Sequence, residues 1–263
     1  MPTSSLLAVQ LYTLRDFCKT PADIAQTLKK VRALGYQAVQ LSALGPIDPA
    51  ELRALLDQDG LTACATHTAF EKMRDTPDAV LAEHKILGCS YTAVGAMPQD
   101  YRALGAAGYT KFAKDASAVA KRLKEGGLTF GYHNHSFEME RYGGRTGLEI
   151  LYAESDPAVF TAELDTYWIA HGGGDPAQWI HNLKGRLPLV HLKDMAMRNN
   201  EGQWHPEQLM AEVGEGNLNW PEILKACHES GVKWYIVEQD TCQRDPFESL
   251  AISFRNLAKM GIH

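Results

Sequence analysis

Residues 130–140 read Phe-Gly-Tyr-His-Asn-His-Ser-Phe-Glu-Met-Glu. The stretch begins apolar and ends polar, which predicts a short buried strand that runs out into a loop. His133, His135 and Glu138 then emerge where the strand ends. Two histidines beside an aromatic strand are more often ordinary hydrogen-bonded residues than ligands, so this stretch does not define a site by itself.

The same arrangement, an apolar run that ends in a carboxylate or an imidazole, recurs three times downstream. The runs end at Asp165, His191 and Glu238. A single acidic residue after a strand is commonly a helix N-cap or half of a buried ion pair. Four such ends in one chain indicate instead that these side chains meet at one site.

Strand-like and helix-like patterns alternate eight times along the 263 residues, in units of roughly thirty residues. This alternation predicts a parallel sheet that closes into a (β/α)8 TIM barrel, forming a single domain over residues 1–263. An open doubly wound sheet is the rival fold. No glycine-rich turn follows the first strand, residues 6–11, where a dinucleotide-binding sheet needs one, so the barrel is favoured.

The composition narrows the classes of partner. A formal charge of -6 without a basic stripe argues against nucleic acid. The five cysteines have no short paired spacing, which argues against a zinc knuckle and a disulfide framework and predicts a cytoplasmic protein. We expect no leader, membrane anchor or membrane partner, because no basic leader or long apolar run is present. A homo-oligomer is compatible with the sequence, which does not specify the oligomeric state.

Carboxylates combined with an imidazole suit a divalent ion such as Mn²⁺, Mg²⁺, Co²⁺ or Zn²⁺, with open positions left for substrate oxygens. Such an ion acidifies a carbon-bound proton beside a carbonyl, because it stabilises the enediolate that forms. Carboxylates on two sides could then serve as base and acid. Isomerisation, epimerisation and elimination all use this chemistry, so the pattern alone does not choose among them.

Several motifs resemble those of the sugar phosphate isomerase/epimerase family, which has the xylose isomerase-like barrel of the AP endonuclease 2 superfamily. This group also includes inosose dehydratase, tagatose epimerase-like enzymes and endonuclease IV relatives. The resemblance covers nearly the whole chain. It is carried by Val-Gln-Leu-Tyr-Thr-Leu-Arg-Asp at 9–16, Gly-Tyr-His-Asn-His at 131–135, Leu-Asp-Thr-Tyr-Trp at 164–168, His-Leu-Lys-Asp at 191–194, Gly-Glu-Gly at 214–216 and Val-Glu at 237–238.

The resemblance implies a divalent metal held by a strand-five carboxylate and by Asp165, His191 and Glu238. Epimerase-like members carry Glu where this chain has His133, and Glu138 lies slightly farther into the loop. We expect Glu138 to be the ligand, because a carboxylate retains the charge balance of the site. His133 is the alternative ligand or a proton-transfer group, so Glu138, Glu238 and His133 are the predicted catalytic residues.

Four further side chains are predicted to contact substrate. Trp168 stands where some epimerases carry His, and it suggests a wall on which a sugar stacks. His67 is either a core histidine or a contact to a substrate hydroxyl, and His135 either orients its loop or touches the ligand. Lys193 either pairs with Asp194 or steadies a substrate oxyanion.

The leading hypothesis is a metal-dependent isomerase or epimerase that acts on a free, oxidised or phosphorylated sugar. The alternative is a lyase that dehydrates a keto-inositol or cleaves a 3-keto-glycoside. A phosphodiesterase related to endonuclease IV and a sugar-binding subunit without catalysis are less favoured. The polar residues 195–220, with Trp204 and His205, are predicted to form an active-site loop that either packs on itself or closes over the sugar.

Overall fold

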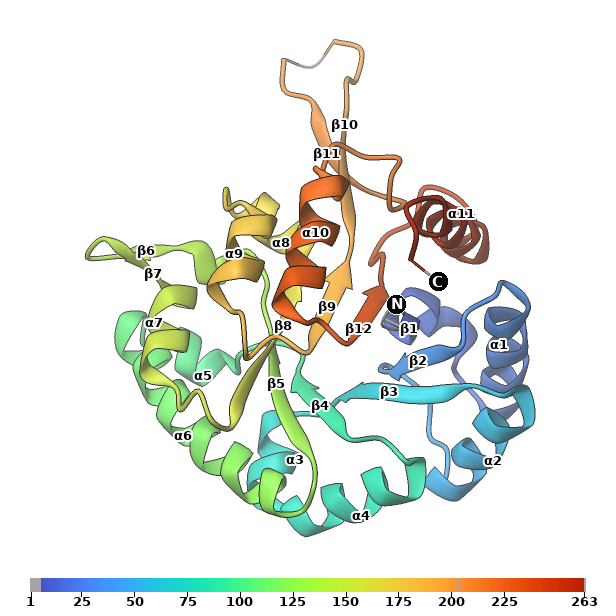
Figure 1. Ribbon diagram of the computed structural model, residues 1–263, viewed down its shortest axis with the longest axis horizontal. Coiled ribbons are helices and arrows are strands. Elements are labelled where there is room, and N and C mark those ends of the chain that lie inside the picture. Colours follow the sequence, from blue (N-terminus) through green and yellow to red (C-terminus); the bar gives the residue numbers. More distant parts are fainter. Residues whose placement is uncertain (1–5, 203, 263) are drawn as a thin grey trace.

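The computed structural model describes residues 6–202 and 204–262, and residues 1–5, where we expected no leader, lie outside this part. Eight parallel strands close into a barrel that is surrounded by helices (Figure 1). This confirms the predicted (β/α)8 fold. In chain order the strands are β1 (Leu6–Gln10), β2 (Ala38–Leu41), β3 (Thr62–His67), β4 (Tyr91–Val94), β5 (Thr129–His133), β8 (Phe160–Asp165), β9 (Leu189–Leu192) and β12 (Trp234–Val237).

The helices begin and end at residues with the expected capping chemistry. Thr20 and Asp23 form a capping box at the start of α1, and Gly60 ends α2 in the left-handed conformation. The α-helices are α1 (Pro21–Ala33), α2 (Pro49–Asp59), α3 (Phe70–Asp75), α4 (Pro77–Leu87), α5 (Gln99–Arg102), α6 (Ala106–Glu125), α7 (Gly147–Glu154), α8 (Thr166–His171), α9 (Pro176–Asn182), α10 (Trp220–Ser230) and α11 (Pro246–Lys259). Two 3-10 helices, η1 (Leu11–Phe17) and η2 (Phe137–Met139), follow β1 and β5.

The barrel interior changes from apolar to polar along the strands. Alternate residues of a barrel strand point inward, so residues two apart share the interior. Near the amino ends the inward residues are small or aliphatic and form one cluster: Ala8, Ala38, Cys64, Ala65, Leu189 and Ile236. Two residues farther along, the inward positions of β1, β2, β9 and β12 carry Gln10, Gln40, His191 and Glu238, all of which are buried. The strand period therefore delivers polar groups to the carboxyl end, where barrel sites form.

The predicted active-site loop, residues 195–220, contains a hairpin that the sequence analysis did not anticipate. The antiparallel strands β10 (Asp194–Arg198) and β11 (Glu207–Ala211) pair along their whole length and project beyond the ring of helices (Figure 1). Trp204, in the connection between them, is 90% exposed. It therefore does not close over the barrel mouth. A second small hairpin, β6 (Arg141–Tyr142) with β7 (Arg145–Thr146), precedes α7.

The described helices include none that combines the length and the apolar character needed to cross a bilayer.

Candidate active site

Four side chains at the carboxyl ends of the strands converge on one point. Each of them offers one ligand atom, and these atoms all lie within 4.8 Å of one another; the residues are His133, Asp165, His191 and Glu238. Ligands on opposite sides of an ion bound at roughly 2.0–2.2 Å lie roughly 4.0–4.4 Å apart. The four donors therefore need to close by only a few tenths of an ångström to share a divalent ion.

Both imidazoles present a defined nitrogen to this cluster. His191 Nδ1 lies 2.9 Å from Glu238 Oε2, while its Nε2 lies 2.7 Å from Gln40 Oε1. His133 Nε2 lies 3.3 Å from Asp165 Oδ2, while its Nδ1 lies 3.1 Å from the carbonyl oxygen of Gly95. Because each outer nitrogen meets an acceptor, each can carry the proton and leave the inner nitrogen free as a ligand.

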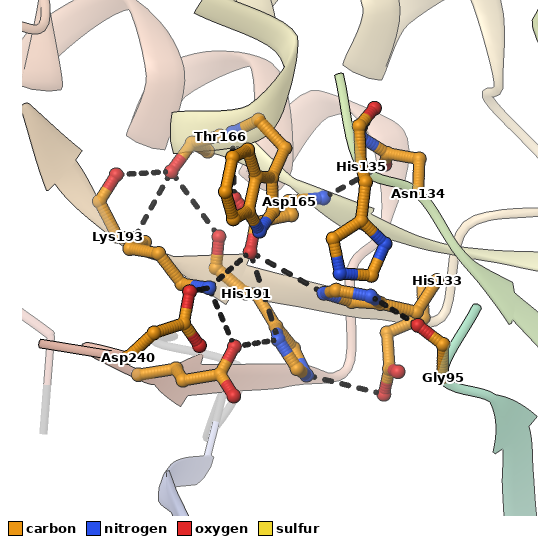
Figure 2. A network of polar contacts seen from close by, with 12 residues as sticks. Gly95, His133, Asn134, His135, Asp165, Thr166, His191, Lys193 and Asp240 are labelled. Carbon is orange, nitrogen blue, oxygen red and sulfur yellow. Dashed lines mark hydrogen bonds and ion pairs between the residues drawn. The ribbon is translucent and has the colours of Figure 1, made fainter. Parts of the chain in front are cut away.

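The buried Lys193 ammonium also reaches the cluster. Its Nζ lies 3.0 Å from Asp165 Oδ2, 2.8 Å from Glu238 Oε2 and 3.0 Å from Asp240 Oδ2. Figure 2 shows the Lys193 amine turned toward Asp165 and Asp240 beside His191. The expected alternative, a pair with Asp194, is wrong, because Asp194 uses its carboxylate elsewhere. Lys193 instead supplies positive charge to the carboxylates of the cluster.

Burial and neighbouring charge oppose each other in this cluster. Burial would raise the pKa of Asp165 and of Glu238, but the Lys193 ammonium and the imidazoles of His133 and His191 together outweigh burial and lower both pKa values. Burial would lower the pKa of His191, but the carboxylates of Glu163 and Glu238 raise it to about 10. The carboxylates of Asp165 and Glu238 therefore stay ionised near neutral pH.

Asp165 has two separate roles, one for each oxygen. Its Oδ1 accepts a hydrogen bond of 2.9 Å from the Trp168 backbone nitrogen and caps α8. Its Oδ2 faces the cluster. Asn134 Oδ1 accepts the Asp165 backbone N–H at 3.0 Å, which ties the loop after β5 to the end of β8 (Figure 2). Asp165 is thus both the N-cap of α8 and a member of the cluster.

Glu138, the expected strand-five ligand, lies outside this group of four. Its Oε1 accepts a 2.7 Å hydrogen bond from the Tyr132 hydroxyl, and its Oε2 accepts a 2.9 Å bond from the His135 backbone nitrogen. Burial raises the pKa of Glu138 to about 7 against these two donors. Both oxygens hold the loop after β5 in shape, and His133 is the residue from this loop that lies beside Asp165, His191 and Glu238.

Asp194 anchors the segment after β9. Its carboxylate is fully buried and accepts hydrogen bonds from four backbone nitrogens and one indole, belonging to Met195, Gly214, Gly216, Leu218 and Trp220. A Cβ on Gly216 would collide with this carboxylate, which explains the second glycine of the Gly-Glu-Gly motif. The base of the projecting hairpin is therefore fixed beside Lys193.

A cavity of about 580 Å³ opens over the cluster. The predicted substrate contacts His67, His135 and Trp168 line it, together with Glu238 and Asp240. His135 Nδ1 and Trp168 Nε1 are buried and have no protein hydrogen-bond partner. Burial, with nearby His133, lowers the pKa of His135 to about 3, so its ring is neutral. An oxygen-rich ligand would satisfy both nitrogens.

Glu163 and Asp240 were not predicted as site residues from the sequence, and Gln40 was assigned no role. Glu163 Oε1 accepts a 2.7 Å bond from Gln40 Nε2, and Glu163 Oε2 lies 2.5 Å from His67 Nε2. Glu163 and Asp240 each lie two residues from a predicted ligand, Asp165 or Glu238. The strand period of two would have placed Glu163 on the inward face of its strand.

A model of one protein family matches most of the chain. It is described as the xylose isomerase-like TIM barrel and matches residues 28–259. The chain belongs to this family. An inosose dehydratase of Geobacillus kaustophilus is 25% identical over 265 aligned residues, which cover 89% of this chain and 84% of that protein. An inosose dehydratase of Bacillus cereus strain AH820 is 27% identical over 154 residues, 53% of this chain and 50% of that protein.

Solved structures share this xylose isomerase-like barrel. A sugar phosphate isomerase/epimerase from Parabacteroides distasonis superposes with a TM-score of 0.81 at 22% identity, covering 97% of this chain and 94% of that one. An L-ribulose 3-epimerase superposes with a TM-score of 0.68 at 15% identity, covering 97% and 94%. At these identities the structures support the fold, and the reaction must be argued from the site.

Proposed function

We propose that this xylose isomerase-like protein is a divalent-metal-dependent enzyme that removes a proton beside the carbonyl of a keto-sugar or related cyclic polyol and returns it as an isomerase or epimerase. One observation carries the proposal. The carboxylates of Glu238 and Asp240, which follow β12, line the same cavity as the imidazoles of His67 and His135, which come from the β3 and β5 side of the barrel. Proton-accepting groups therefore lie on both sides of a bound substrate.

The donor set fits a divalent metal. His133, Asp165, His191 and Glu238 supply two imidazoles and two carboxylates, a set that suits manganese, zinc or cobalt better than magnesium. The hydrogen bonds from the outer imidazole nitrogens to Gly95 and Gln40 are the supports that ligand histidines require. When bound, the ion would stabilise negative charge that develops on the substrate carbonyl oxygen.

Each side chain of the cavity has a proposed role. Glu238, which is 4% exposed, accepts the substrate proton, and His133 holds the metal in place of Glu138. Trp168 and His135 bind substrate hydroxyls through their unpartnered nitrogens, while His67 contacts a hydroxyl from the opposite side. Lys193 holds Glu238 and Asp240 in position and adds positive charge near the carbonyl oxygen.

Elimination is the second candidate, because the aligned relatives are inosose dehydratases and one of them aligns over most of its length. The first step would be the same proton removal by Glu238. A hydroxyl or glycosidic oxygen on the adjacent carbon would then leave with its bonding electrons and take up a proton, and a carbon–carbon double bond would form. The product, rather than the base, distinguishes the two reactions.

The decisive experiment incubates the manganese-loaded protein with keto-inositol, ketohexoses and 3-keto-glucosides in D₂O and follows each substrate by NMR. Deuterium at the carbon beside the carbonyl, without loss of water or of the glycosidic group, supports the isomerase or epimerase. Loss of either supports the lyase. Failure of every substrate to exchange, together with nicking of abasic DNA, would contradict both candidates and favour a phosphodiesterase.

A further inference from the structure

The motif at residues 9–16 has no role in the proposed reaction, although one of its side chains lies at the site. The motif spans the end of β1 and most of η1. Tyr12 lines the cavity over the cluster, together with Glu238 and Asp240. It is 37% exposed. Tyr12 therefore reaches the space in which the substrate is proposed to lie.

The backbone that bears Tyr12 is fixed by three hydrogen bonds. The Tyr12 backbone nitrogen donates to Gln10 Oε1 at 3.3 Å, and the Tyr12 carbonyl oxygen accepts a 2.9 Å bond from an Arg15 guanidinium nitrogen. The Thr13 hydroxyl oxygen accepts a 3.0 Å bond from the backbone nitrogen of Gln239, in the segment after β12. This part of η1 therefore has a defined position beside the end of β12.

Tyr12 and Trp168 differ in what surrounds their rings. Four side chains lie 4.9–5.5 Å from the centre of a Trp168 ring: His135, Tyr167, His171 and Lys193. The guanidinium carbon of Arg15 lies 4.4 Å from the centre of the Tyr12 ring, over one of its faces. Because one guanidinium covers one face of a ring, Tyr12 can present its other face to the cavity.

Tyr12 lies across the barrel from the predicted substrate contacts. In the closed ring of strands, β1 and β5 have three strands between them on either side, so they are opposite each other. Tyr12 follows the last residue of β1 by two positions, as His135 follows the last residue of β5. A ligand that reaches His135 and Trp168 on one side therefore meets Tyr12 on the other.

A buried nitrogen on the β1 side also lacks a partner. Gln10 is fully buried, and its Nε2 has no hydrogen-bond partner in the described part of the chain. His135 Nδ1 and Trp168 Nε1 are in the same condition across the barrel. Buried polar atoms without a partner are costly, and each one requires an explanation. A ligand with oxygen atoms on both sides would satisfy all three.

We propose that Tyr12 is a substrate-binding residue whose open face packs against the C–H face of a closed ring, so that the site selects cyclic over open-chain polyols. A closed ring presents a continuous C–H surface to an aromatic face, and an open chain does not. The inference rests on the proposed function, because it takes the polyol to lie over the cluster. It narrows the substrate to a ketone of a carbon ring or of a glycoside, since closing the ring of a ketohexose consumes its carbonyl.

The test compares two polyols that have the same number of hydroxyl groups, cyclic myo-inositol and open-chain sorbitol. Each is titrated into the full-length protein loaded with Zn²⁺, which is diamagnetic. The Trp168 indole N–H signal, assigned with Trp168→Phe, reports whether the polyol enters the cavity. The ¹⁹F signal of Tyr12 in protein labelled with 3-fluorotyrosine, assigned with Tyr12→Phe, reports contact on the β1 side.

We expect myo-inositol to shift both signals and sorbitol to leave the Tyr12 signal unchanged. If Trp168 responds to myo-inositol and Tyr12 does not, the inference fails while the polyol site stands. If neither signal responds to either polyol, the inference and the proposed polyol site both fail. A Tyr12 signal that responds equally to both polyols, or that responds without Trp168, also overturns the inference.

Variants test the same point by affinity. Tyr12→Ala should weaken myo-inositol binding about tenfold and sorbitol binding less than about twofold, because it removes the packing surface. Tyr12→Phe keeps the ring and should bind myo-inositol within about twofold of the wild type. Phe17→Ala is the matched control, because Phe17 also lies on η1, is 39% exposed and does not line the cavity.

Two outcomes would contradict the packing role. One is an unchanged affinity for myo-inositol in Tyr12→Ala. The other is an equal loss of affinity in Tyr12→Phe, which would assign the effect to the hydroxyl group rather than to the ring.

Discussion

Two polar clusters share the imidazole of His191, and they differ in how their atoms are satisfied. The upper cluster contains His133, Asp165, His191 and Glu238, and His191 turns its Nδ1 toward the two carboxylates. The lower cluster contains His67, Glu163 and His191, and His191 turns its Nε2 toward Glu163. Both groups place histidine and carboxylate atoms close enough to share an ion. Counting nearby ligand atoms therefore does not tell them apart.

Their hydrogen bonds do. In the lower cluster Gln40 donates to Glu163 at 2.7 Å and accepts from His191 at 2.7 Å, while Glu163 meets His67 at 2.5 Å. These contacts close a network in which donors and acceptors alternate. In the upper cluster two carboxylates, from Asp165 and Glu238, converge on the single ammonium of Lys193, with Asp240 as a third. An excess of acceptor charge, rather than proximity, marks the cluster that can take a cation.

The largest expected effect is that of removing the proposed base, Glu238, from the upper cluster. Glu238→Gln should slow carbon–hydrogen exchange of an accepted substrate in D₂O about a thousandfold, because it removes the proposed base. The measurement is the rate of deuterium incorporation by NMR with saturating Mn²⁺. Glu229→Gln on α10 is the matched control, since that carboxylate is 46% exposed and does not line the cavity over the cluster. A rate within tenfold of the wild type would remove Glu238 from the mechanism.

The charge balance of the upper cluster can be broken at Lys193. Lys193→Met should lower the free energy of unfolding by about 3–5 kcal/mol without metal, because it leaves buried carboxylates uncompensated. Mn²⁺ should recover part of this loss, since the cation binds the native cluster and stabilises it. Urea unfolding with and without Mn²⁺ measures both effects. A loss that Mn²⁺ does not reduce would show that the upper cluster is not a cation site.

Glu138 sharpens the comparison, because it is a buried carboxylate held by the Tyr132 hydroxyl and the His135 backbone nitrogen. Its pKa in the folded protein is about 7, above the ordinary 4.5, so the native state binds the proton more tightly than the unfolded chain does. The resulting stabilisation is complete below pH 4.5 and is lost as the pH rises through 7.

Relative to the uncharged variant Glu138→Gln, wild-type stability should therefore fall by about 3 kcal/mol between pH 4.5 and pH 8. Urea unfolding of both proteins across this range gives the measurement. Parallel stability curves would mean that Glu138 titrates normally and that burial does not dominate its environment.

The smallest effect belongs to the lower cluster. Glu163→Gln keeps the shape of the side chain but removes an acceptor that His67 and Gln40 use, so it should destabilise the protein by about 1–3 kcal/mol. Added Mn²⁺ should stabilise this variant by the same increment as the wild type, because the upper donors are intact. A Mn²⁺ increment that vanishes in Glu163→Gln would show that the lower cluster, too, takes part in binding the ion.

The fold and part of the site could be predicted from the sequence for one physical reason. Parallel strands end at the same face of a barrel, so the polar residues that follow apolar runs must meet there, as Asp165, His191 and Glu238 do. Strand ends are visible in a single sequence. The direction of a loop side chain is not, and this is why Glu138 was expected in the cluster and lies outside it.

Other parts of the site depend on contacts between distant segments. Lys193 pairs with Asp240 rather than with its neighbour Asp194, because successive residues leave a strand on opposite sides. The hairpin of β10 and β11 was expected as a loop, since its polar composition hides the alternation that forms a strand pair. The ion pair of Lys193 and the pairing of β10 with β11 both depend on which segments meet in the folded chain, and composition does not reveal this.

The five hydrogen bonds that Asp194 accepts fix the base of the hairpin against the barrel. The residues on either side of the excursion are tied to one carboxylate, so the outer part of the hairpin can change without moving the strand that bears His191. The turn that carries Trp204 is therefore a suitable place to graft an epitope or a fluorescent label. A protein modified there should keep its barrel, and the reporter would stand clear of the barrel mouth.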